Sequence, residues 1–184
     1  MKKTPILIIY LFLNQVLLSQ NIDKLEFPTT VKPEISQSIS KYLYVKSEEN
    51  AQKLDSLKTT EQKHFKKNII GVWEYFDSEC SCCVKKKNKK KITKYIKITE
   101  DRIFFYKRKI SKKNLTQTEK LEFASQYDIF SDLTSLVFKD NSIWSFKVDK
   151  TNNYLKIYNS GKESENGRSS FVSGIITEYY KRIE

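Results

Sequence analysis

Apolar and polar residues alternate along most of the chain that follows residue 69. In one run Trp144, Phe146 and Val148 alternate with Ser145 and Lys147. A period of two puts the apolar side chains on one face, which is typical of a strand with one buried face. The pattern predicts eight strands, at residues 69–77, 91–99, 102–109, 118–127, 133–138, 142–149, 153–159 and 172–183.

Short polar segments connect these strands. Glu100-Asp101, Asp140-Asn141 and residues 150–153 are rich in residue types that adopt left-handed conformations in tight turns. Because such connections are too short for crossover helices, neighbouring strands are expected to be antiparallel. Closing the sheet removes its edges, so the sequence predicts a mainly β chain folded as an eight-stranded up-and-down β-barrel. Residues 159–170, rich in serine, glycine and charge, are predicted to be flexible.

The chain before the barrel has a helical pattern. Pro33 suits the first turn of a helix, and Ile35, Ile39 and Tyr42 fall on one helical face. Residues 47–67 are highly charged and predict a second helix with few apolar anchors. We therefore expect residues 20–68 to form a linker with one or two short helices, and residues 69–184 to form the barrel.

The first nineteen residues resemble a secretory signal peptide. A basic start, Met1-Lys2-Lys3, precedes an apolar stretch from Ile6 to Leu18, and Ser19 is a suitable cleavage residue. The apolar stretch is too short for a typical membrane-spanning helix, although an uncleaved anchor is the alternative. We expect export to the periplasm or the extracellular space, with no transmembrane segment after cleavage. N-terminal sequencing of exported protein tests cleavage after Ser19.

The chain is strongly basic, with a formal net charge of +12. This charge favours anionic partners such as lipid headgroups, acidic polysaccharide or nucleic acid. Lysines are nevertheless spread along the whole chain, which favours a general compositional bias over one selected partner. The densest run, Lys85–Lys91, is predicted to be a solvated loop because its charges repel one another.

The chain resembles the lipocalin-like domains of the calycin superfamily found in exported bacterial proteins. Gly71-Val72-Trp73 on the first strand and Tyr180-Lys181-Arg182 on the last carry the resemblance. It implies that Trp73 packs across the closed end of the barrel and that Arg182 lies over its indole. Thr151-Asn152-Asn153 lacks the acidic residue of the second lipocalin motif. A β-sandwich or an open barrel is the alternative fold.

The resemblance implies non-catalytic binding of a small apolar or amphipathic ligand inside the barrel. The candidate lining residues are aromatic: Phe105, Phe123, Trp144 and Phe146. The alternative is an envelope structural or interaction protein with a side-chain-filled barrel and a basic, lysine-rich loop that contacts anionic surfaces. Eight strands enclose room either for side chains alone or for one small ligand. Aromatic and lysine residues could also stack single-stranded bases, but eight strands do not match the five-stranded nucleic-acid-binding barrel.

Candidate catalytic groups are few. Strand carboxylates, Glu74, Asp77, Glu119 and Glu122, could form a paired-carboxylate hydrolase only if two of them meet. The sequence contains no phosphate-binding glycine-rich loop. We expect a protein that is not an enzyme and has no cofactor, and its oligomeric state does not follow from the sequence.

Three cysteines cluster at Cys80, Cys82 and Cys83. In an exported chain a local disulfide is the favoured interpretation, and it would close too short a loop to stabilise the fold much. Two alternatives stay open. One is a site for Cu(I) or zinc, with His64 as a further ligand, and the other is redox exchange by a Cys-x-x-Cys pair.

Overall fold

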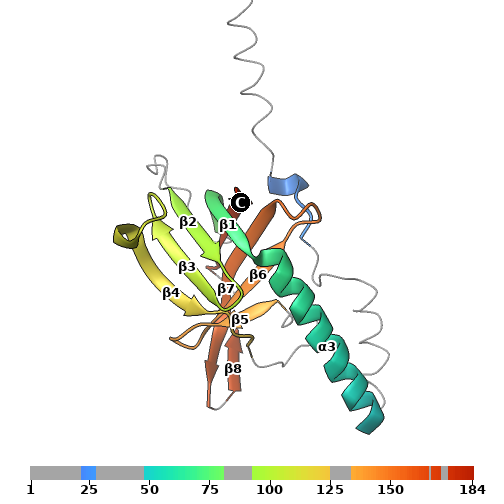
Figure 1. Ribbon diagram of the computed structural model, residues 1–184. Coiled ribbons are helices and arrows are strands. Elements are labelled where there is room, and N and C mark those ends of the chain that lie inside the picture. Colours follow the sequence, from blue (N-terminus) through green and yellow to red (C-terminus); the bar gives the residue numbers. More distant parts are fainter. Residues whose placement is uncertain (1–21, 28–47, 81–92, 125–133, 166, 171–173) are drawn as a thin grey trace, which may run out of the picture.

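The computed structural model describes residues 22–27, 48–80, 93–124, 134–165, 167–170 and 174–184. Within these ranges one long helix, α3 (Glu48–Ile69), leads directly into an antiparallel sheet (Figure 1). Two short 3-10 helices are present, η1 (Ile22–Lys24) and η2 (Lys112–Asn114). The strands are β1 (Gly71–Cys80), β2 (Lys94–Ile98), β3 (Arg102–Lys107), β4 (Leu115–Lys120), β5 (Ser135–Val137), β6 (Ser142–Val148), β7 (Tyr154–Ser164), β8 (Gly167–Ser170) and β9 (Ile176–Arg182).

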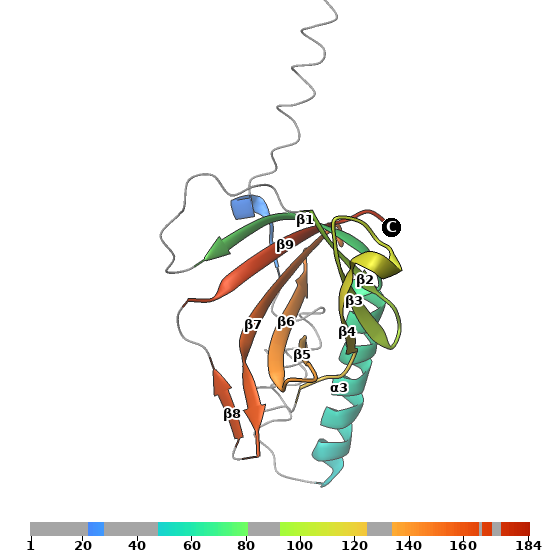
Figure 2. The same cartoon turned by 90° about the vertical axis from the view of Figure 1, so that its left-hand side faces the viewer.

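The strands follow an up-and-down order in which the last long strand returns beside the first. The order across the sheet is β4-β3-β2-β1-β9-β7-β6-β5, and β8 pairs with β7 outside this path. The sheet curls into a half-barrel (Figure 2). Its two ends approach each other at an isolated bridge between Phe123 and Leu136, supported by a 3.0 Å bond from the Ala124 N–H to the Ser135 carbonyl.

The alternating pattern predicted the sheet well. Each of the eight predicted ranges overlaps an observed strand, and the predicted antiparallel pairing is confirmed. The turn residues also behave as expected, because Asn141 and Asn152 adopt positive φ angles of 62° and 60°. The predicted helix that begins at Pro33 and the lysine-rich run at 85–91 lie outside the described residues.

The prediction that residues 159–170 are flexible was wrong. Strand β7 continues to Ser164 and pairs with β8, where Lys162 faces Ser169. The Glu163 N–H also donates to the Asn141 carbonyl at 2.8 Å. Backbone hydrogen bonds therefore define this hairpin, and its serine-, glycine- and charge-rich side chains concealed it.

The junction between helix and sheet also differs from the prediction. Residues 69 and 70 were assigned to the first strand, but helix α3 continues to Ile69 and the Ile70 N–H donates to the Lys66 carbonyl at 3.2 Å. The helix is favoured because its last turns bury one face. Glu61, Phe65 and Ile69, spaced four residues apart, are each 1% exposed or less.

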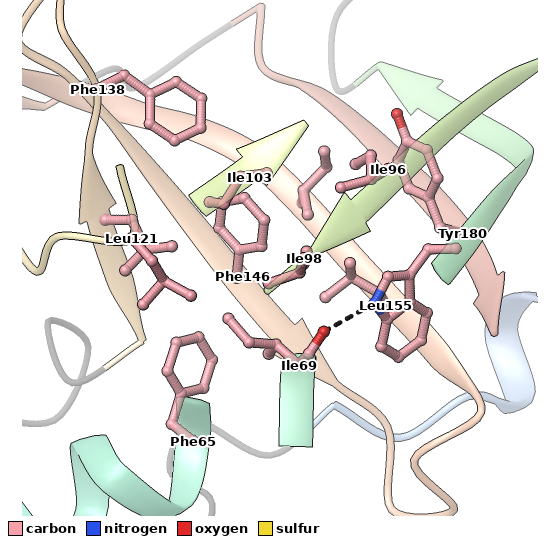
Figure 3. Packing of buried hydrophobic residues seen from close by; sticks show 13 residues of the cluster. Phe65, Ile69, Ile96, Ile98, Ile103, Leu121, Phe138, Phe146, Leu155 and Tyr180 are labelled. Carbon is pink, nitrogen blue, oxygen red and sulfur yellow. Dashed lines mark hydrogen bonds between the residues drawn. The ribbon is translucent and has the colours of Figure 1, made fainter. Parts of the chain in front are cut away.

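Helix α3 and the concave side of the sheet share one core. In Figure 3, Phe65 and Ile69 of α3 face Leu121, Ile98 and Phe146 from the sheet. Most of these side chains are fully buried, and the N-terminal half of the helix extends away from the core (Figure 1). The helix is therefore attached to the sheet mainly through its C-terminal turns.

Gly71 forms the turn from α3 into β1. Its φ of +145° is a conformation that side-chain-bearing residues rarely adopt. A Cβ at this position would lie 2.5 Å from Arg182 Nη1 and 2.5 Å from the Glu184 carbonyl oxygen. Only glycine therefore lets the end of the chain approach this junction closely.

We predict that Gly71→Ala lowers the free energy of unfolding by roughly 2–4 kcal/mol, because it combines backbone strain with a forced shift of Arg182. Gly174→Ala is the matched control. Gly174 also has a positive φ, +70°, but a Cβ there would meet nothing within 4 Å. Gly174→Ala should lower the free energy of unfolding by about 1 kcal/mol, the cost of the backbone strain alone. Equal losses in urea denaturation would contradict the close-approach explanation.

Candidate functional site

The contact implied by the lipocalin resemblance is present. Trp73 and Arg182 are directly paired residues on the neighbouring strands β1 and β9. The Arg182 guanidinium carbon lies 4.0 Å from the centroid of the Trp73 indole, which is a cation–π contact. Trp73 is completely buried, and its indole N–H donates to the Ile69 carbonyl at 2.8 Å (dashed line in Figure 3).

Arg182 also holds the end of helix α3. Its Nη1 donates to the Ile70 carbonyl at 2.6 Å, and its Nη2 donates to the Asn68 carbonyl. The last carbonyls of a helix lack partners within the helix and carry partial negative charge, so a cation placed there is favourable. Burial lowers the pKa of Arg182, while the charge of Asp149 opposes that shift. Arg182 and Trp73 together satisfy three successive carbonyls, those of residues 68–70.

Asp149 is a structural residue that the sequence analysis missed. It is 5% exposed and accepts 2.9 Å bonds from the backbone N–H groups of Asn153 and Tyr154. These bonds shape the β6–β7 turn so that the Asn152 carbonyl accepts from Arg182 Nε at 2.8 Å. Asp149 lies just before residues 151–153, the segment that lacks an acidic residue. A signal was available, because an aspartate that begins a turn commonly accepts bonds from later backbone N–H groups.

The predicted barrel-lining aromatic residues pack in the core, three of them around Phe138 and the fourth against helix α3. All four belong to the core or contact it: Phe105, Phe123, Trp144 and Phe146. Phe138 links three of them, with ring centroids 5.9 Å from Phe105, 5.5 Å from Trp144 and 6.3 Å from Phe146. Phe123 lies 5.9 Å from Phe65 of α3. This part of the concave side is therefore occupied by side chains.

A polar cluster lies beside this aromatic core. The Tyr180 hydroxyl donates to Glu178 at 2.6 Å, and Lys94 forms an ion pair with the same carboxylate. The Lys94 ammonium also lies 5.2 Å from the ring centroid of Tyr75. Burial, assisted by Glu178, raises the pKa of Tyr180 well above its ordinary value. The cluster places one ion pair and one neutral phenol next to apolar walls.

The carboxylates suggested for hydrolysis have separate structural partners. Glu74 accepts a 3.0 Å bond from Tyr95, and Asp77 accepts from the Ser78 N–H at 2.7 Å. Glu119 accepts from Gln117 and, at 2.9 Å, from the Lys139 N–H, which joins β4 to the β5–β6 turn. Each of these three carboxylates therefore has a structural hydrogen bond of its own. The backbone carbonyl of Glu122 accepts a 2.9 Å bond from the Val137 N–H.

The cysteine cluster is only partly within the described residues. Cys80 ends β1 and is disulfide-bonded, which removes it as a thiolate ligand, while Cys82 and Cys83 lie outside the described ranges. His64 lies on α3, with its Nε2 3.4 Å from the Asn68 amide. The described residues hold no group of three or more histidine, cysteine or carboxylate side chains placed to bind a metal ion.

A hollow on the convex side of the sheet was not foreseen. Its volume is about 390 Å³, and Phe27, Lys147, Lys156 and Tyr158 contribute to its walls. The lysines and Tyr158 belong to β6 and β7, and Phe27 comes from the segment 22–27 near the start of the described chain. Sequence periodicity places these strand residues on the outer face, but it does not reveal which distant segment covers them.

A second surface feature is a cluster of cations at residues 107–113, from the last residue of β3 into the connection to β4, here named the basic turn. It holds five exposed cationic side chains, those of Lys107, Arg108, Lys109, Lys112 and Lys113. Arg108 has a φ of 71°, and its N–H donates to the Thr93 carbonyl at 2.9 Å. In the sequence the lysine run at 85–91 is denser, and it concealed this second group of cations.

No protein-family model, curated protein or solved structure matches this chain. Within the described part of the chain, no helix is long and apolar enough to cross a membrane.

We predict that Trp73→Ala lowers the free energy of unfolding by roughly 3–5 kcal/mol, the usual cost of removing a buried aromatic side chain. Arg182→Ala should cost about 1–3 kcal/mol, because it leaves backbone carbonyls without donors. The two losses should be non-additive in denaturant unfolding, since the side chains touch. Lys181→Ala is the control, because Lys181 points to the opposite, exposed face of β9. Additive losses would mean that the contact contributes nothing.

Proposed function

We propose that this protein is an exported, non-catalytic interaction protein of the cell envelope that docks on an anionic membrane surface through the basic turn. Its barrel is a rigid scaffold, and recognition takes place on the outside. The single observation that carries this proposal is the basic turn, with five exposed cations among seven consecutive residues. Within the described ranges none of these five side chains forms a salt bridge.

The packing of the concave side supports a scaffold. The aromatic rings around Phe138 contact one another through that residue, as side chains do in an ordinary close-packed core. The same argument favours the filled form of the lipocalin-like barrel. A rigid scaffold suits a docking protein, because the cations are presented at little conformational cost.

Apolar side chains near the cations favour a membrane over other polyanions. Ile110, inside the basic turn, is 41% exposed, and Leu115, just after η2, is 39% exposed. Cations attract anionic lipid headgroups, and apolar side chains can enter the boundary below them. A polysaccharide or a nucleic acid phosphate backbone offers no comparable apolar layer.

Ligand binding inside the barrel is the second candidate. The polar cluster of Tyr75, Lys94, Glu178 and Tyr180 favours it, because a few polar groups next to apolar walls are typical of ligand sites. Mass spectrometry of an organic extract of purified protein separates the two functions. A stoichiometric, neutral lipid-like molecule would support barrel binding, and a clean protein would count against it.

We predict that the protein sediments with vesicles containing phosphatidylglycerol and much less with pure phosphatidylcholine vesicles. A triple variant, Lys109→Gln, Lys112→Gln and Lys113→Gln, should weaken this partitioning by about 100-fold, since each cation near the surface contributes roughly 1 kcal/mol. Added salt should weaken the wild type as well.

The matched control carries Lys120→Gln, Lys162→Gln and Lys181→Gln. These lysines are also exposed and lie outside the basic turn. The control variant therefore has the same net charge as the test variant. Little loss in this control supports a localised docking surface. Equal losses in the two triple variants would mean that net charge alone drives binding, and the proposal would fail.

A further inference from the structure

The hollow on the convex side of the sheet combines two lysines with aromatic side chains from distant parts of the chain. Its walls come from β1, β6, β7 and β9 and from the segment 22–27 that crosses over them. Its volume of about 390 Å³ is within the range of small-molecule sites. We propose that it binds a small amphipathic anion, with an acidic head group at the lysines and an apolar body against the aromatic rings.

The charge of the hollow favours an anion. Lys147 of β6 and Lys156 of β7 are directly opposed in the sheet, and both are half-buried. Like charges in this arrangement repel each other and destabilise the sheet. Neither lysine forms a salt bridge within the described part of the chain. An anionic group between the two ammonium groups would remove the repulsion and accept hydrogen bonds from both.

The acidic residue of the hollow does not neutralise this pair. Glu79 on β1 accepts a hydrogen bond from the hydroxyl of Tyr179. Counting this carboxylate against the two lysines still leaves one positive charge at the site. A ligand with a single negative charge therefore fits better than a neutral or cationic one.

The remaining walls suit an apolar body. Phe27 and Tyr158 contribute rings, and Thr177 contributes a small side chain between them and β1. The Phe27 ring lies 5.9 Å from that of Tyr179, and the Lys156 ammonium lies 5.7 Å from the centroid of each. The rings of Phe27 and Tyr179 therefore both contact the ammonium group of Lys156.

Specific contacts place Phe27 over the strands. Its neighbour Glu26 forms an ion pair with Lys150, and the Lys150 N–H donates to the Glu26 carbonyl at 3.2 Å. The segment is thereby fastened to the β6–β7 turn, which Asp149 shapes. This site shares no residue with the basic turn. Its proposed function can therefore be tested separately from the proposed docking function.

The test uses 1-anilinonaphthalene-8-sulfonate, an aromatic anion whose fluorescence rises in apolar surroundings, as the probe. Purified protein should bind it saturably. Lys147→Gln should weaken binding by about tenfold, the effect of losing one charged hydrogen bond of about 1.5 kcal/mol. Phe27→Ala should weaken it by about fivefold through lost apolar contact, about 1 kcal/mol. Lys97→Gln, which removes an exposed lysine on β2, should leave binding within about twofold of wild type, as a screened surface charge contributes little.

Competition identifies the head group. Dodecanoate should displace the probe, and dodecanol at the same concentration should not, because only the carboxylate can lie between the lysines. Dodecanoate should also raise the thermal unfolding temperature of the wild type more than that of Lys147→Gln. Equal displacement by the alcohol, or equal probe affinity in Lys147→Gln and Lys97→Gln, would overturn the proposal.

Discussion

The guanidinium of Arg182 is the point at which four parts of the chain meet. It donates to carbonyls at the end of α3 and in the β6–β7 turn, it lies on the indole of β1, and its own backbone belongs to β9. A partly buried carbonyl that loses its donor costs more than the hydrogen bond itself contributes. The position of α3 therefore depends on one side chain near the end of the chain.

The rest of the core follows from that position. Once the last turn of α3 is held against β1, Phe65 and Ile69 enter the concave side and meet Leu121, Ile98 and Phe146 (Figure 3). Gly71 makes this possible because any Cβ would occupy the place of the Arg182 guanidinium. The aromatic rings around Phe138 fill the neighbouring part of the half-barrel. The basic turn and the convex hollow lie outside this core.

The sequence predicted most of the sheet, because period-two alternation and asparagine-rich turns are local signals. The stacking of Arg182 on Trp73 came from the resemblance, and the geometry agrees with it. Features that depend on backbone pairing alone, or on partners far apart in sequence, escaped prediction. The β7–β8 hairpin rests on backbone bonds, and the role of Asp149 depends on where its turn meets Arg182. The convex hollow needs Phe27 to cross strands more than a hundred residues away.

Hydrogen–deuterium exchange on an Arg182→Lys variant tests the central role of Arg182 most directly. Lysine keeps the charge but loses the planar fork that reaches several carbonyls at once. We expect amides of residues 61–69 to exchange faster, while β6 and β7 keep their protection, because only the attachment of α3 is weakened. Unchanged protection of α3 in this variant would contradict the claim that Arg182 holds the helix on the sheet.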